Sequence, residues 1–138
     1  MNPSHLLLDT HIWLWFALGL RTRLGASSIK LIEQSESIQV SIISVWEIAL
    51  LENKGRVVLP LPISEWISQA LAPPTVQLVG LEHPLVVIDS CRLPGRFHAD
   101  PADRFLVATA RATGATLMTR DEKIIEYGTQ GHVKVMAA

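Results

Sequence analysis

Five acidic residues stand where a parallel sheet would bring them together. They are Asp9, Glu47, Asp100, Asp103 and Asp121. The aspartates fall at expected strand-to-helix junctions, and the glutamate falls in the first turn of another expected helix. Because ligands of open parallel sheets bind along the carboxyl edge of the strands, residues distant in sequence can meet there as one carboxylate cluster.

A carboxylate cluster of this kind indicates a bound cation. Like charges a few Å apart repel each other and raise each other's pKa, and a divalent cation removes that repulsion. Oxygen ligands suit Mg²⁺ or Mn²⁺ better than zinc, which prefers nitrogen and sulfur. A hard cation so held can activate water and neutralise charge on a phosphodiester. The pattern therefore indicates metal-assisted phosphodiester hydrolysis.

Helix starts offer a simpler explanation for several of these acids. Ser44 and Glu47 match a capping box. Asp100 can be an N-cap, followed by Pro101 at N1 and Asp103 at N3. The helix dipole favours acids in first turns by a few tenths to ~1 kcal/mol. Taken singly, each of these acids is explained by its helix.

Asp9 fits the capping explanation least. It ends an apolar run directly before a helix that contains Trp13 and Trp15, where an unpaired carboxylate would be costly if buried. Thr119 is an alternative cap for the helix that contains Asp121. Helix caps alone would scatter acids over the surface, whereas these acids follow successive strands of one sheet. The joint pattern favours a site.

Basic side chains and histidines accompany the acids. The basic ones are Arg21, Arg23, Arg104, Arg120 and Lys123. Contact with phosphate is one interpretation of them, and solvated charges that pair with acids of the same helix are the other. His11 and His98 suit metal ligation or acid–base chemistry, or more simply a contact that supports a carboxylate.

Three further residues have structural explanations. Trp46 and Trp66 fall at helical positions and are expected in the core or in dimer contacts. Cys91 has no neighbouring base, so we expect an inert thiol. It is the sole cysteine, which excludes a disulfide framework and fits a reducing cytoplasm.

Length and composition predict one domain over residues 1–138 with a buried core. The longest apolar candidate, 12–20, is shorter than the ~18 residues of a membrane span. It also lacks the basic start of a signal peptide, so we expect a cytoplasmic protein without a membrane segment. The formal net charge of −1 argues against a general nucleic-acid coat.

Strand and helix patterns alternate along the chain. Strands are expected at 5–8, 38–40, 76–79, 116–118 and 133–135, with brief pairing at 57–59. Helices are expected at 12–18, 27–35, 44–51, 63–71, 81–88, 102–113 and 121–127, and Gly19 and Gly114 are expected to end two of them. This alternation implies an α/β domain with a mostly parallel sheet covered on both faces.

Four short segments that contain these acids follow one another along the chain. They are LLLDTH at 6–11, SVWEIA at 44–49, HADPADRFLVATA at 98–110 and LMTRD at 117–121. Together they resemble the PIN-domain family, and in particular the VapC-type toxins of bacterial toxin–antitoxin modules. The resemblance covers almost the whole chain. It implies a three-layer α/β/α fold with about four or five strands, and a Mg²⁺- or Mn²⁺-dependent endoribonuclease. It also implies a homodimer held inactive by a cognate antitoxin.

The resemblance assigns roles residue by residue. It places Asp9, Glu47, Asp103 and Asp121 in the acidic site, and Thr119 beside the last acid, where it would position water or phosphate. Asp100 belongs to the subgroup form His-x-Asp-Pro-x-Asp-Arg and is expected as a cap or as a support for Asp103.

Our leading hypothesis is an RNA-cleaving enzyme. Asp9 and Asp103 would be the main metal ligands, and Glu47 and Asp121 would complete the pocket. One of the acids, or a hydroxide on the metal, would supply the base, while Arg104 and Arg120 would contact substrate phosphate.

Two other hypotheses remain open. A phosphotransferase or phosphatase that works through an aspartyl-phosphate would also gather acids at a sheet edge, although the chain has Asp9-Thr10-His11 where the dehalogenase type has Asp-x-Asp. A catalytically inactive PIN-like module would bind RNA or protein without cutting it.

Overall fold

The computed structural model describes residues 3–138 as a parallel sheet between helices. The strands are β1 (His5–Leu8), β2 (Ser37–Ser41), β3 (Val76–Val79), β4 (Thr116–Thr119) and β5 (Val135–Ala137). The helices are α1 (Thr10–Leu18), α2 (Ala26–Gln34), α3 (Ile42–Asn53), α4 (Ile63–Ala70), α5 (Pro84–Cys91), α6 (Pro101–Thr113) and α7 (Glu122–Thr129). All strands are parallel, in the order β3-β2-β1-β4-β5.

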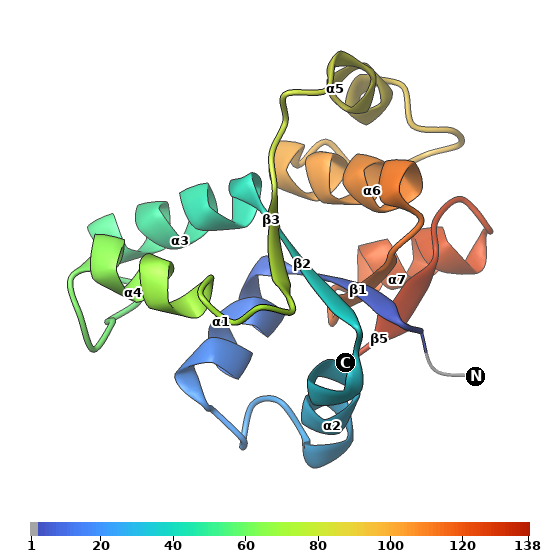
Figure 1. The fold of residues 1–138 in the computed structure, drawn as a ribbon. Coiled ribbons are helices and arrows are strands. Elements are labelled where there is room, and N and C mark those ends of the chain that lie inside the picture. Colours follow the sequence, from blue (N-terminus) through green and yellow to red (C-terminus); the bar gives the residue numbers. More distant parts are fainter. Residues whose placement is uncertain (1–2) are drawn as a thin grey trace.

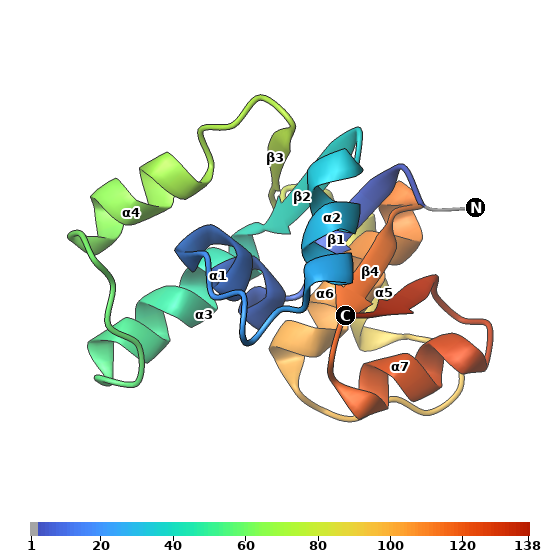
Figure 2. The same cartoon turned by 90° about the horizontal axis from the view of Figure 1, so that it is seen from below.

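Helices cover both faces of this sheet, as the sequence predicted. Figure 1 shows α5 and α6 on one side of the sheet and α1 and α2 on the other. The alternation of side chains along β1 divides the core accordingly. Leu6 and Leu8 pack with Trp13 of α1, whereas Leu7 packs with Leu106 of α6. The fold is a three-layer α/β/α arrangement, and α4 and α7 lie at opposite ends of it (Figure 2).

The sheet order brings the carboxyl ends of three strands together. β1 lies between β2 and β4, with Leu7 in register with Gln39 and with Leu117. Each of these strands passes into a helix at the same edge of the sheet. The residues that follow β1 and β4, together with the start of α3, therefore meet at one place.

The start and end of α6 agree with the sequence prediction. Asp100 is the N-cap and accepts a hydrogen bond from the Asp103 N–H, and Pro101 occupies the first helical position. Gly114 follows the helix with a φ of 74°, a left-handed conformation that glycine adopts without steric cost. The end of α1 at Gly19 is likewise confirmed.

Two predicted caps are wrong. Ser41, not Ser44, caps α3 and accepts from the Ile43 N–H, so the helix starts earlier than the capping box suggested. Asp121 itself, not Thr119, caps α7. Both hydroxyls that were expected to cap a helix are fully buried. The Ser44 hydroxyl bonds to Thr10, and the Thr119 hydroxyl donates to Asp9 while it accepts from the N–H of Asp121, the residue that caps α7.

Other boundaries also differ from the prediction. Residues 57–59 form no strand, and Val57 and Leu59 pack on the core instead. The last strand starts at Val135, and Val133 precedes it as part of the core beside α6 and α7. The helix expected at 81–88 begins at Pro84. The helix expected at 27–35 begins at Ala26 after Gly25, and no side chain caps it. Within residues 3–138 no helix is long and apolar enough to cross a bilayer.

Candidate active site

Asp9 lies between β1 and α1 with both carboxylate oxygens held. Oδ1 accepts from the Thr10 N–H at 2.7 Å, and Oδ2 accepts from the Thr119 hydroxyl at 2.6 Å. Burial raises the pKa of Asp9, while these two hydrogen bonds act in the opposite direction. The Thr119 side chain therefore fixes Asp9 from the neighbouring strand β4.

Glu47 is fixed by a chain of hydroxyl groups. The Thr10 hydroxyl donates to Glu47 Oε1 and lies 2.8 Å from the Ser44 hydroxyl. Because Thr10 has a single hydroxyl proton, Ser44 is the donor of the second bond. Burial is the main reason that the pKa of Glu47 is raised, and repulsion from Asp9 adds to it. Glu47 thus lies on α3 close to Asp9, the acid that follows β1.

Asp103 lies in the first turn of α6, with only 15 % of its side chain exposed. Burial raises its pKa to about 7, and repulsion from Asp100, Asp9, Asp121 and Glu47 contributes in that order. Asp103 is therefore the acid on which the charge of the whole cluster acts most strongly.

His98 contacts the same carboxylate. Its Nε2 atom lies 2.9 Å from Asp103 Oδ2. The geometry is not that of a hydrogen bond, and Nε2 has no hydrogen-bonding partner among residues 3–138. The contact is attractive when the imidazole is protonated. His98 thus occupies the supporting position that the sequence suggested. His11, by contrast, is exposed and packs at a tilt on Trp15.

A pocket of about 460 Å³ unites the five acids. Asp121 enters it from the start of α7, where its Oδ1 atom accepts from the Lys123 N–H at 2.8 Å. The lining residues are Asp9, Thr10, His11, Ile12, Trp15, Glu47, Asp100, Asp103, Arg120 and Asp121. The structure therefore brings together every acid that the sequence singled out, from four separate segments.

The two arginines expected at substrate phosphate differ in placement. Arg120 lines the pocket, and its guanidinium lies over the Trp15 ring at 5.3 Å. Arg104 is not available for phosphate, because its guanidinium donates to the backbone carbonyls of His98, Ser90 and Phe97, each at 2.9 Å. Arg104 instead holds the segment that leads into α6.

Other expected positions also resolve. Trp66 is buried in the core, as predicted, but Trp46 is 56 % exposed, so a core position is wrong for it. Cys91 is an exposed free thiol.

Sequence reasoning missed the roles of Thr10 and Ser44 in fixing Glu47. Thr10 directly follows Asp9, and Ser44 was taken for a cap. The signal that could have found Thr10 is a small hydroxyl residue directly after an expected site acid.

The donor set fits a hard divalent cation in its chemistry. Within residues 3–138 no three His, Cys, Asp or Glu side chains are already arranged as a metal site. The pocket nevertheless offers five carboxylates as oxygen ligands, besides the imidazole of His11, and burial with mutual repulsion raises the pKa of Asp9, Glu47 and Asp103. A cation would relieve that repulsion.

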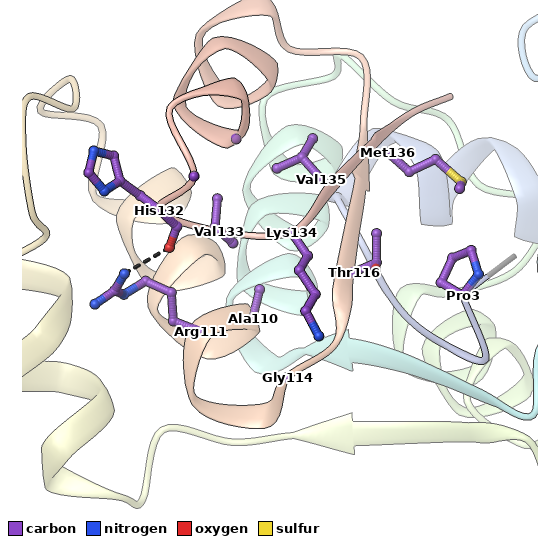
Figure 3. Close-up of a pocket in the computed structure, with 12 residues that line it drawn as sticks. Pro3, Ala110, Arg111, Gly114, Thr116, His132, Val133, Lys134, Val135 and Met136 are labelled. Atoms are coloured by element: carbon purple, nitrogen blue, oxygen red, sulfur yellow. Dashed lines mark hydrogen bonds between the residues drawn. The ribbon is translucent and has the colours of Figure 1, made fainter. Parts of the chain in front are cut away.

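A larger hollow lies away from the acids. It has a volume of about 850 Å³ and lies beside β5, where Arg111 donates to the His132 carbonyl at 2.8 Å and Lys134 extends across the opening (Figure 3). Among residues 3–138, no acidic side chain lines it. The carboxylate pocket, not this hollow, is the candidate site.

Fold and pocket together define an α/β protein with an acidic site at the carboxyl edge of a parallel sheet. The chain belongs to the PIN-domain family, whose model matches residues 6–129.

Relatives support this assignment. The chain is 34 % identical over 118 residues to "Ribonuclease VapC22" of Mycobacterium tuberculosis, which covers 86 % of this chain and 88 % of the relative. A structure of VapBC2 from Rickettsia felis, bound to a DNA fragment from its promoter, matches with a TM-score of 0.67 at 15 % identity, over 96 % of this chain and 98 % of the other. The VapBC-5 toxin–antitoxin structure from Mycobacterium tuberculosis matches with a TM-score of 0.60 at 13 % identity, over 98 % of each chain. At these identities the two structures establish the shared fold.

Proposed function

We propose that this chain is a divalent-metal-dependent endoribonuclease and the toxin of a toxin–antitoxin pair. The observation that carries the proposal is the convergence of five acids from four segments on one pocket, with the pKa of Asp103 raised to about 7. Membership of the PIN-domain family and similarity to a protein named as a ribonuclease support the choice of RNA.

Asp9 and Asp103 are the residues that would hold the cation, with Glu47 and Asp121 completing the pocket. When bound, Mg²⁺ or Mn²⁺ supplies charge neutralisation at the phosphodiester and activation of water. Thr119 and the Thr10 N–H keep Asp9 in one orientation, so the carboxylate enters the reaction without a loss of rotamer freedom.

The remaining steps belong to the other side chains of the pocket. One of the acids accepts the proton of the attacking water. The Thr10 hydroxyl orients Glu47 by donating to Oε1. Arg120, at the rim of the pocket, contacts a phosphate of the substrate.

The test is cleavage of purified total RNA with Mn²⁺ by the wild-type protein, Asp9→Asn and Asp103→Asn. Asp89→Asn is the matched control, because Asp89 is a partly exposed acid that pairs with Arg111 outside the pocket. We expect cleavage by the wild type and the control and none by the two site variants, with unchanged circular dichroism. Cleavage by both site variants, or in excess EDTA, would overturn the proposal. Calorimetric Mn²⁺ binding that needs Asp103, without any cleavage, would instead identify a binding module.

The proposal includes an antitoxin as protein partner. Structural neighbours described as VapBC toxin–antitoxin complexes support it. An apolar groove of about 480 Å³ between α1, α2 and α4, lined by Phe16, Ile32 and Trp66 among others, suits an apolar segment of such a partner. Co-purification of this chain with the product of an adjacent small reading frame, lost in Phe16→Glu, would test it.

The proposal also includes a homodimer. Leu85 and Ile88, one turn apart on α5, are 68 % and 50 % exposed, and α5 lies on the outside of α6 (Figure 1). Exposed apolar side chains on one helical face suit an interface with a second copy. Light scattering of the purified chain gives the mass, and we expect Leu85→Glu to convert a dimer into a monomer.

A further inference from the structure

Trp46 is an exposed aromatic side chain at the side of the acidic site. It precedes Glu47 on α3 and is 56 % exposed. Trp13 and Trp66, by contrast, are buried, with exposed fractions of 2 % and 5 %. Large apolar side chains left in water are informative because burial of an aromatic ring is strongly favourable. Trp46 is therefore placed to bind something that approaches from solvent.

The surroundings of Trp46 join it to the carboxylates. It lines a pocket of about 300 Å³ together with His11, Glu47 and Asp100, all three of which also line the acidic pocket. The two hollows are thus adjacent and share part of their lining. A ligand whose reacting group lies at the acids extends naturally onto the indole ring.

Basic side chains line both of these adjacent hollows. Lys54 and Arg56 line the Trp46 pocket, are exposed, and form no ion pair within residues 3–138. Arg120 lines the acidic pocket and lies over the Trp15 ring, which Arg23 also approaches at 5.9 Å. Each hollow therefore combines an aromatic ring with a basic side chain that forms no ion pair within the described residues.

We propose that Trp46 stacks on an unpaired base of the RNA and that Lys54 and Arg56 contact the phosphates beside that base. The inference rests on the proposed function, since it specifies how the substrate crosses the acidic site. Aromatic stacking next to backbone-tracking cations is how single-stranded nucleic acid is held without base-specific hydrogen bonds. The substrate is then single-stranded where it meets α3, because a paired base is already stacked within its duplex.

A base is favoured over a protein surface by the chemistry around the ring. Half of the residues lining the Trp46 pocket are ionisable: His11, Glu47, Lys54, Arg56 and Asp100. The core of a protein–protein interface is depleted in charged residues. Ile42, one turn earlier on α3, is 37 % exposed and gives the competing possibility, an interface in which both side chains are covered.

The experiment measures binding separately from cleavage. A fluorescein-labelled single-stranded RNA 12-mer of mixed sequence is titrated in EDTA with the wild type, Trp46→Ala, Trp46→Phe and Trp46→Leu, and the anisotropy gives Kd. We expect Trp46→Ala and Trp46→Leu to weaken binding about 5- to 100-fold and Trp46→Phe to stay within a few fold. Ile42→Ala, on the same helix, is the matched control with unchanged affinity.

Intrinsic fluorescence supplies a second readout. RNA should quench part of the wild-type emission, and that part should be missing in Trp46→Phe. Unchanged affinity of Trp46→Ala, no detectable RNA binding by the wild type, or equal losses for Trp46→Phe and Trp46→Ala would overturn the proposal. A change in the oligomeric mass of Trp46→Ala in solution, with unaltered RNA affinity, would assign the residue to a protein interface instead. Binding that depends on Trp46 in a chain that does not cut RNA would support this inference while refuting the nuclease.

Discussion

Replacing Asp103 by asparagine should stabilise the metal-free protein at alkaline pH. Folding raises the pKa of this carboxyl from 3.8 to about 7 because it is buried among other acids. A group whose pKa is raised holds its proton more tightly in the folded state. The stability that this tighter proton binding contributes is therefore complete below about pH 4 and is lost as the pH rises to 7. Above pH 7 the folded chain carries a buried carboxylate that repels its neighbours.

The size of the effect follows from the shift. A rise of about three pKa units corresponds to about 4 kcal/mol, which is the most that removing the charge can recover. The replacement amide must also find partners in a mostly buried position, so we expect a gain of about 2–4 kcal/mol at pH 8.

Urea unfolding in EDTA from pH 4 to pH 8.5 measures this gain. The advantage of Asp103→Asn should be absent near pH 4 and should grow toward pH 7.5. Asp100→Asn is the comparison variant: it removes the charge that repels Asp103 most, while asparagine still caps α6, so it should give only part of the gain. With Mn²⁺ present, the wild type should instead be more stable than Asp103→Asn, because only the wild type gains stability from the cation. Equal stabilities of wild type and Asp103→Asn at pH 8 in EDTA would refute the reasoning.

Two further predictions concern residues that support the site. Thr119→Val removes the hydroxyl that donates to Asp9, so the pKa of Asp9 should rise. The acidic limb of the pH–cleavage profile should then move to higher pH, and an unmoved limb would contradict this role of Thr119. Arg104→Ala leaves three backbone carbonyls without their charged donor and should lower the free energy of unfolding by about 2–4 kcal/mol in urea, with the affinity of the folded protein for RNA unchanged.

Local signals predicted much of this fold. The apolar run before Asp9 and the Asp100–Pro101 helix start are short-range patterns, and the structure confirms both β1 and α6. The start of α3 was misplaced because Ser41 and Ser44 are equally good caps by local rules. Only the tertiary contact between Ser44 and Thr10 decides between them.

The site was predictable in its residue types and not in its details. Parallel topology alone was enough to expect that the acids of β1, α6 and α7 would meet. The hydrogen bonds that Arg104 donates to three backbone carbonyls depend on the path of residues 90–98, and no local sequence pattern encodes that path. The exposure of Trp46 was missed for a related reason, since helical spacing does not say which face of α3 the sheet covers.

The central position of β1 ties activity to the completion of folding. β1 pairs with β2 on one side and with β4, more than a hundred residues further along the chain, on the other. Asp9 is clamped by Thr119 at the end of that late strand. A chain in which β4 and α7 have not yet been made, or have locally unfolded, lacks both the clamp on Asp9 and the contribution of Asp121 to the pocket. Any activity of the site is thereby delayed until β4 has been made and has paired with β1.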